Sequence, residues 1–295
     1  MRFWILLIVC LIPQNGFAKD KKKKDAPSKS SPSTSTVALT IETGSHGSGS
    51  YQFNAILDEQ ERTFLLDTGS RFTAVEQDRH FSKYKINGFY TAKGLSGKSK
   101  RMSTIIVDEI NVGGVSLKKQ RIALLPEKFK IKNLFGMDTL WQLCVALRHK
   151  DKTLTFKEKC DGKQGSKIAK YKGNLILLEP EINGQKYRML LDSGASVTVL
   201  NQDLAEKLKL EKKSDEKVKI VDSSRVRSAK NLFALPALKW DGVTFTDIEI
   251  IYSDLNAFQQ RNPERIDGII GFNVIDQADW VFDLPNSMIH AEAIR

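Results

Sequence analysis

Histidine and cysteine are scarce in this sequence, which has four histidines and three cysteines among 295 residues. The histidines are His46, His80, His149 and His290, and none has a partner at the spacing of metal ligands. We therefore expect no metal site and no cofactor. Cys144 and Cys160 flank a predicted hairpin. They either form a disulfide bond or remain two buried thiols, and the sequence favours neither alternative.

A long apolar run is also missing. The ten apolar residues 3–12 are about half of the roughly 20 residues that a membrane span needs. Arg2, this run and the small residues near Ala18 form the pattern of an export signal. We expect cleavage after Ala18, a periplasmic or secreted protein, and no stable membrane insertion. Cys10 follows Val9 rather than Gly or Ala, which argues against a lipoprotein site.

No nucleic-acid-binding motif accompanies the formal net charge of +11. Much of the excess lies in residues 1–36, which hold seven Lys and Arg residues against two Asp residues. Residues 19–36 are rich in Lys, Ser and Pro, and we predict that they form a disordered basic linker that solubilises the protein or contacts an anionic surface. A nucleic-acid partner is not expected.

Two stretches of the sequence nearly repeat each other. Residues 64–70 read FLLDTGS and residues 189–195 read MLLDSGA. Each is an apolar run typical of a buried strand, followed by an acid, a small hydroxyl residue and a glycine that marks a tight turn. Because an unpaired carboxylate is costly to bury, we expect the fold to bring Asp67 and Asp192 together.

Other motifs repeat in the same order. The triplet Leu-Phe-Gly at 134–136 corresponds to Ile-Ile-Gly at 269–271, and the turn Gly113-Gly114 corresponds to Asp241-Gly242. The spacing between matched positions drifts from 125 residues at the acids to 135 at these triplets, as loop insertions would produce. A repeat this long is not a solenoid. We predict two copies of one β-rich domain, over residues 37–160 and 161–295.

Between these motifs the sequence predicts strands and tight turns. Residues 51–57 alternate between apolar and polar, as on a half-buried strand. Residues 94–97 are expected to be the tip of a hairpin whose return arm is 104–107. Asn183-Gly184 predicts a second hairpin turn, and residues 200–210 have the apolar spacing of a short amphipathic helix.

Two such domains, facing each other across a pseudo-two-fold axis, would bring the repeated turns together. Carboxylates about 3 Å apart cannot both ionise, so the pair would share one proton. The ionised acid could take a proton from water while the protonated acid polarises a carbonyl group, which is general acid–base attack on an amide. Gly69 and Gly194 would let the turns come close and adopt otherwise strained backbone dihedrals. The hydroxyls of Thr68 and Ser193 would either hydrogen-bond across the axis or serve as local caps.

With these motifs the sequence resembles the aspartic peptidases of the retropepsin and pepsin kind, over roughly residues 37–295. The resemblance implies an all-β fold of two retropepsin-like β-barrel lobes related by a pseudo-two-fold axis, with short helices. It makes Asp67 and Asp192 the catalytic acids, supported by the loop residues Thr68, Gly69, Ser70, Ser193 and Gly194. It also implies a monomeric peptidase, an intramolecular pseudo-dimer, that acts on peptide or protein substrates.

The resemblance further implies that the hairpin tips act as flaps over the substrate. Gly94 and Gly97 lie at the first tip, and Tyr90 in its rising arm would either bind substrate or pack as an ordinary core or surface tyrosine. The second tip, residues 222–225, is polar and has no glycine. The alternative of a different class is a catalytically silent peptide-binding module on the same fold.

One difference between the loops predicts how the pair titrates. Ser70 follows the first motif and Ala195 follows the second. A Ser70 hydroxyl that donates to the outer oxygen of Asp67 would favour the ionised form there. We therefore predict that Asp67 is the more acidic member and that Asp192 carries the shared proton.

Overall fold

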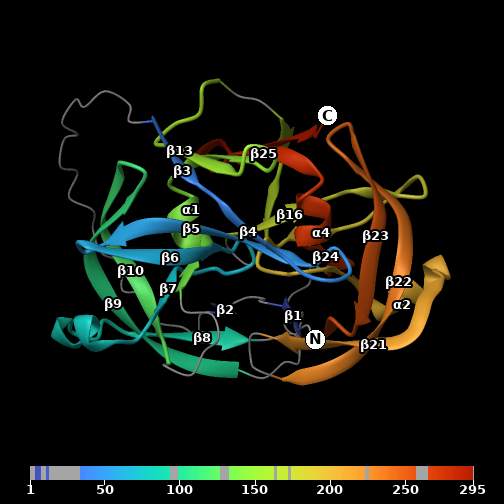
Figure 1. Cartoon of the computed structure of the whole chain (residues 1–295), viewed down its shortest axis with the longest axis horizontal. Coiled ribbons are helices and arrows are strands. Elements are labelled where there is room, and N and C mark those ends of the chain that lie inside the picture. Colours follow the sequence, from blue (N-terminus) through green and yellow to red (C-terminus); the bar gives the residue numbers. More distant parts are fainter. Residues whose placement is uncertain are drawn as a thin grey trace.

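Strands make up most of the structure and are grouped in three sheets (Figure 1). The computed structural model describes residues 4–7, 11–12, 34–93, 99–126, 133–162, 165–171, 174–222, 226–256 and 265–294. Two N-terminal strands aside, each half of the chain builds one sheet, and both halves share the third. Within the described residues, no helix has the length and apolar character needed to cross a membrane.

The first sheet has the strand order β2-β8-β9-β10-β7-β11-β6-β5-β4. Its strands are β2 (Leu11–Ile12), β4 (Thr40–Thr43), β5 (Gly49–Leu57), β6 (Gln60–Leu66), β7 (Ala74–Glu76), β8 (Phe89–Lys93), β9 (Ser99–Val112), β10 (Val115–Leu125) and β11 (Asn133–Phe135). The short helices η1 (Arg79–Lys83) and α1 (Met137–Leu140) accompany them. The alternation predicted for residues 51–57 is confirmed, because Tyr51, Phe53, Ala55 and Leu57 are buried and the residues between them are not.

The second sheet has the order β1-β21-β22-β23-β20-β24-β19-β16-β15; off this path, β17 pairs with β22 and β18 pairs with β17. Its strands are β1 (Trp4–Leu7), β15 (Ala169–Tyr171), β16 (Leu175–Leu178), β17 (Glu181–Ile182), β18 (Gln185–Lys186), β19 (Met189–Leu191), β20 (Thr198–Asn201), β21 (Lys212–Asp222), β22 (Arg227–Trp240), β23 (Val243–Ser253) and β24 (Gly268–Ile270). Helices α2 (Gln202–Leu208) and α4 (Phe272–Ile275) pack beside it. Asn183 and Gly184 both have positive φ, so the predicted hairpin turn is confirmed.

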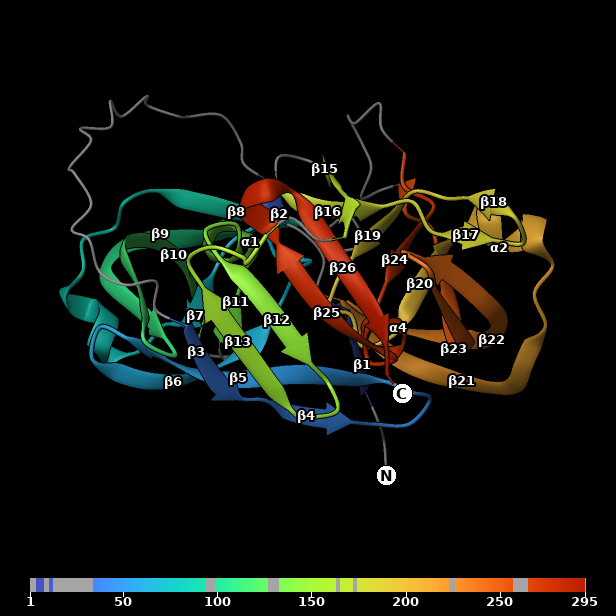
Figure 2. The ribbon, with the colours of Figure 1, turned by 90° about the horizontal axis from the view of Figure 1, so that it is seen from above.

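The third sheet joins the two halves of the chain. Its order is β14-β26-β25-β12-β13-β3, with β3 (Thr34–Ala38), β12 (Cys144–Arg148), β13 (Thr153–Lys157), β14 (Ser166–Lys167), β25 (Ala278–Asp283) and β26 (Met288–Ala293), and with helix η2 (Leu284–Asn286) between β25 and β26. Figure 2 shows this sheet between the two lobes. Because β12 pairs with β25, the lobes share a continuous hydrogen-bonded layer.

Strand pairing repeats between the first two sheets. In the first, β11 runs parallel to β6 and antiparallel to β7, which in turn is parallel to β10. In the second, β24 runs parallel to β19 and antiparallel to β20, which is parallel to β23. The predicted all-β fold with two lobes is therefore confirmed. Because the pairing is the same, each repeated sequence motif occupies the equivalent position in its own lobe.

Two elements differ from the sequence-based expectation. Residues 34–36, assigned to the disordered linker, belong to β3 and pair with β13, where the hydroxyls of Thr36 and Thr155 lie 2.9 Å apart. The linker prediction extended too far because Ser and Thr serve equally in linkers and in edge strands. The return arm of the first hairpin is also longer than expected, since β9 runs without interruption from Ser99 to Val112.

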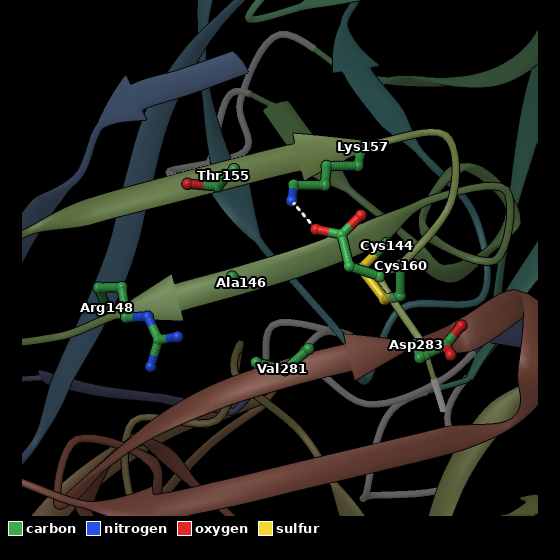
Figure 3. A pocket seen from close by; sticks show the side chains of 10 residues that line it. Cys144, Ala146, Arg148, Thr155, Lys157, Cys160, Val281 and Asp283 are labelled. Atoms are coloured by element: carbon green, nitrogen blue, oxygen red, sulfur yellow. Dashed lines mark hydrogen bonds and ion pairs between the residues drawn. A yellow bond between two sulfur atoms is a disulfide. The ribbon is translucent and has the colours of Figure 1, made fainter. Parts of the chain in front are cut away.

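Cys144 and Cys160 form a disulfide bond, with their Cα atoms 5.2 Å apart and their positions separated by 16 in sequence. This resolves the alternative that the sequence left open. The disulfide lines a cavity of about 260 Å³ on the shared sheet (Figure 3). The charged groups of this cavity already have partners: Lys157 pairs with Asp161 and Arg148 pairs with Asp279.

We expect the double variant Cys144→Ser/Cys160→Ser to lose about 2–4 kcal/mol of unfolding free energy, since the disulfide restricts the unfolded chain. Urea unfolding of the variant and the parent, with and without reductant, measures this. The reductant should lower the stability of the parent to that of the variant and leave the variant unchanged. Equal stabilities in the absence of reductant would contradict the prediction.

Candidate active site

The two repeated acids stand at the ends of buried strands. Asp67 follows β6 directly and Asp192 follows β19. The backbone amide of Asp67 donates to the Phe135 carbonyl of β11 at 3.1 Å, and the amide of Asp192 donates to the Ile270 carbonyl of β24 at 2.9 Å. Each amide thus extends the strand pairing with the apolar-apolar-Gly triplet of its lobe. The apolar-apolar-Gly triplets therefore position the acidic turns from behind.

Hydrogen bonds across the pseudo-two-fold axis hold the turns together. The Thr68 hydroxyl donates to the Leu191 carbonyl at 2.9 Å and accepts from the Ser193 amide at 2.9 Å. The Ser193 hydroxyl donates to the Leu66 carbonyl at 2.7 Å and accepts from the Thr68 amide at 3.1 Å. Each hydroxyl therefore hydrogen-bonds to the opposite lobe. Of the two roles left open for Thr68 and Ser193, the structure shows hydrogen bonding across the axis rather than local capping.

The carboxyl groups of Asp67 and Asp192 are almost fully buried. The inner oxygen Oδ1 of Asp67 accepts from the amides of Gly69 at 3.1 Å and Ser70 at 2.8 Å, and Oδ1 of Asp192 accepts from Gly194 at 2.9 Å and Ala195 at 3.1 Å. The outer oxygen Oδ2 of each is buried and has no hydrogen-bond partner among the described residues. These outer oxygens are the atoms available to a substrate or a water.

Burial raises the pKa of both carboxyl groups. It raises the pKa of Asp67 to about 7, although the hydrogen bonds that the amides of Ser70 and Gly69 donate to the carboxyl group lower this pKa. Burial and then the charge of Asp67 raise the pKa of Asp192 well above its ordinary value. Because the two acids act on each other, they titrate as one pair. The directions of both shifts keep a proton on the pair at neutral pH.

The loop glycines make this proximity possible. A Cβ atom added to Gly69 would lie 2.1 Å from Cγ of Asp192, and one added to Gly194 would lie 2.6 Å from Oδ1 of Asp67. Neither glycine has a positive φ. They leave space for the opposite carboxyl group, as predicted, but the strained backbone dihedrals that we also expected for them are wrong.

The expected role of the Ser70 side chain is wrong. Its hydroxyl donates to the carbonyl of Phe72 at 2.8 Å, and only its backbone amide reaches Asp67. The turn after Ser70 brings the Phe72 carbonyl within reach of the hydroxyl, so the side chain closes the loop locally. It cannot supply the difference in acidity between the two aspartates that we inferred from it.

A second layer behind the acids was not predicted. In the first lobe, Oδ1 of Asp138 accepts from the amide and hydroxyl of Thr73 at 2.7 and 3.0 Å. In the second, Oδ1 of Asn273 accepts from the amide and hydroxyl of Thr198, both at 2.9 Å. The sequence repeats these residues at matching positions. Each Thr lies six residues after the buried aspartate of its lobe, and Asp138 and Asn273 each lie two residues after the glycine of the triplet.

The lobes differ here because one layer carries an acid and the other an amide. Burial raises the pKa of Asp138 to about 6, although hydrogen bonds from Thr73 and Thr139 oppose the shift. A folded-state pKa above the unfolded value favours folding while the group is protonated, and this contribution is lost as pH rises from about 4 to about 6.

We therefore expect Asp138→Asn to gain stability relative to the parent over that pH window, by on the order of 2 kcal/mol. Chemical denaturation of both proteins at pH 4, 5, 6 and 7 checks this. Their difference in unfolding free energy should grow up to about pH 6 and then stay constant. A difference that does not vary with pH would contradict the assignment.

The first hairpin contacts the acidic loop through Tyr90. The Tyr90 ring on β8 stacks on Phe72, with ring centroids 3.4 Å apart and planes 14° apart. Burial raises the pKa of its hydroxyl to about 12, and Asp138 adds to the shift while Arg121 and Arg71 oppose it. The residues Gly94 and Gly97, expected at the flap tip, lie outside the described residues, as do residues 223–225 of the second tip.

Fold and site together define a bilobed protein in which a pseudo-two-fold axis pairs two buried aspartates. The family model for aspartyl protease matches residues 53–139 and 178–274, which together are more than half of the chain. The chain therefore belongs to the aspartyl protease family, and each lobe carries one match. No curated protein matches the sequence.

Proposed function

We propose that the protein is an endopeptidase in which the pair Asp67 and Asp192 activates a water molecule to hydrolyse a peptide bond. The observation that carries this proposal is the pair of outer carboxylate oxygens, both buried and without a protein partner among the described residues. The ionised member takes a proton from water, and the protonated member donates to the carbonyl oxygen of the scissile bond. The water oxygen bonds to the carbonyl carbon as this happens. The tetrahedral intermediate then collapses when the acid that took the proton from water passes it to the amide nitrogen and the C–N bond breaks.

A peptide-binding module without activity is the competing function. Two features favour the enzyme. The acids are intact in both lobes, and their pKa values are raised by a burial that a binding module has no reason to retain. The glycines also leave each carboxyl group just enough room beside the opposite loop.

Export to the periplasm or the cell exterior is part of the proposal. It is supported by the signal-like residues 1–18 and by the Cys144–Cys160 disulfide, which suits an oxidising compartment. We propose a monomer, because one chain supplies both acids and both halves of the shared sheet. Its partners are peptide or protein substrates.

Incubation of the purified protein with a diverse peptide pool from about pH 3 to 8, followed by mass spectrometry, tests the function. We expect internal peptide bonds to be cleaved, with activity retained at neutral pH, and a statine-type transition-state mimic to block cleavage. Peptides that bind without being cleaved at any pH would support the binding module instead.

A further inference from the structure

We propose that His46 of the first lobe is a positioning residue for Asp192 in the second lobe, acting through its ion pair with Glu249. This rests on the proposed peptidase function and adds a regulation of that same site. Peptide cleavage then responds to pH through a pair of side chains outside the two acids, and this pair joins the lobes most tightly while His46 is charged.

A tight turn between β4 and β5 carries His46 to the second lobe. The amide of Ser48 donates to the Ser45 carbonyl at 3.1 Å. The two residues between them, His46 and Gly47, both have positive φ, 61° and 63°, as in a type I′ turn. A Cβ atom added to Gly47 would lie 3.3 Å from Cβ of Asn273, and Figure 1 shows the β4–β5 hairpin extending towards α4. The turn therefore holds His46 against the second lobe.

Glu249 on β23 has one basic side chain at each of its carboxylate oxygens. Nδ1 of His46 lies 2.9 Å from Oε2, and Nζ of Lys213 on β21 donates to Oε1 at 2.8 Å. Although the His46 ring is close, Oε2 is buried and forms no aligned hydrogen bond within the described residues. The charge of the ring is then what offsets the cost of burying this oxygen. Deprotonation of His46 therefore weakens the contact between the lobes.

The backbone of Glu249 is tied to the layer behind Asp192. The side-chain amide of Asn273 donates to the Glu249 carbonyl at 2.6 Å. Oδ1 of the same Asn273 accepts from the amide and hydroxyl of Thr198, both at 2.9 Å. The Thr198 hydroxyl in turn accepts from the amide of Gly271 at 3.1 Å. Asn273 thus connects β23 to β20 and to the glycine of the triplet.

From the triplet, the contacts reach the acid in two further steps. The amide of Phe272 donates to the Ala195 carbonyl at 2.7 Å, and the amide of Ala195 donates to Oδ1 of Asp192 at 3.1 Å. A shift of β23 is therefore passed to Asp192 although His46 itself does not touch the acid. Since a misplacement of about 1 Å can cost about 10²-fold in rate, a smaller shift is sufficient for the effect proposed.

The first lobe does not repeat this link. Its residue at the position of Asn273 is Asp138, and an ionised carboxyl group only accepts hydrogen bonds, so it cannot donate to a strand carbonyl. Strand register also places Arg121 of β10 where the second lobe has Glu249. The connection to the opposite lobe therefore acts on Asp192 and not on Asp67, and it accounts for the amide at position 273.

His46 is the member of the group that changes charge near neutral pH. Glutamate is ionised and lysine protonated throughout the range from about pH 5 to 8 in which histidine loses its proton. The elements around the pair carry other charged residues near it in sequence: Glu42 on β4, Lys212 on β21, Asp247 on β23 and Asp276 after α4. Burial raises the pKa of Asp276 to about 7. The test therefore compares variants of His46 itself.

The ratio of kcat in a variant to kcat in the parent, measured from pH 5 to 8, tests the proposal, because titration of the two acids affects both proteins. His46→Asn removes the charge and suits a left-handed turn position. Its kcat should be about fivefold below that of the parent at pH 5, within the range for coupling through contacts, and equal to it at pH 8. His46→Lys keeps a cation and should match the parent at pH 5 and exceed it at pH 8. A His46→Asn ratio that does not vary with pH would overturn the proposal.

Two further variants separate positioning from a general effect of histidine loss. In the Glu249→Gln background the ion pair is absent, so His46→Asn should have no further effect at any pH. His290→Asn is the matched control, because Nδ1 of His290 also lies 2.9 Å from a carboxylate, that of Asp241, and both histidine side chains are 39% exposed. Its ratio should stay near one from pH 5 to 8. The same pH dependence in His290→Asn would overturn the assignment to His46.

Failure of this regulation and failure of the peptidase function give different results. Cleavage with a ratio that is constant across pH overturns the role of His46 and leaves the peptidase. Without any cleavage, the ¹³C NMR titration of the Asp192 carboxyl group in the parent and in His46→Asn still tests the connection. A titration midpoint that changes in His46→Asn but not in His290→Asn would support it, and identical titration curves would overturn it.

Discussion

Asp67→Asn and Asp192→Asn are each expected to lower kcat/KM by about 10³-fold or more, near the upper range for loss of a general acid or base. A neutral amide can neither accept a proton from water nor hold the shared proton. The substitution preserves shape, and the Asn oxygen can still accept the bonds that the amides of Gly69 and Ser70 donate to Asp67. Steady-state kinetics on a fluorogenic peptide measures the loss.

The loss should not come from unfolding. Because burial raises the pKa of Asp67 to about 7, ionisation of this carboxyl group disfavours the folded state near neutral pH, and Asn removes that effect. Thermal unfolding of both variants should therefore show stability at least equal to that of the parent. Asp138→Asn is the matched control, since the second lobe already has Asn273 in this role, and it should keep full activity. Turnover that survives in either dyad variant would contradict the mechanism.

The fold could be predicted largely because it is repeated. A single Asp-Ser/Thr-Gly turn is a weak signal, whereas two in the same order with their triplets define a duplicated domain. Residues 64–66 and 189–191 become buried strands as expected, and the acids meet at the axis. Burial of two carboxylates forces this pairing, so a simple energetic argument was sufficient to predict it.

What the sequence did not reveal depends on contacts between distant residues. The Ser70 hydroxyl donates to the Phe72 carbonyl because of the path of the loop, and the sequence alone does not show that path. The pairing of β12 with β25 joins residues more than 130 positions apart, with no local signal to announce it.

Gly69→Ala is the substitution expected to damage the site most without removing a functional group. The added Cβ would lie 2.1 Å from Cγ of Asp192 and 2.3 Å from both of its oxygens, a distance at which the carboxyl group must move. A displacement of about 1 Å can cost about 10²-fold in rate, and the overpacking should lower the unfolding free energy by about 1–3 kcal/mol.

Gly194→Ala should have the same effect to a smaller extent, because its Cβ would lie farther from the opposite carboxyl group, 2.6 Å from Oδ1 of Asp67. Gly44→Ala is the control: its nearest contact would be the Ser48 hydroxyl at 2.6 Å, at the end of a side chain that can rotate, so activity should be unchanged. Steady-state kinetics and chemical denaturation of the three variants measure the order of their losses in activity and stability. Full activity in Gly69→Ala would mean that the two carboxyl groups do not need this separation, and the shared proton would then not explain catalysis.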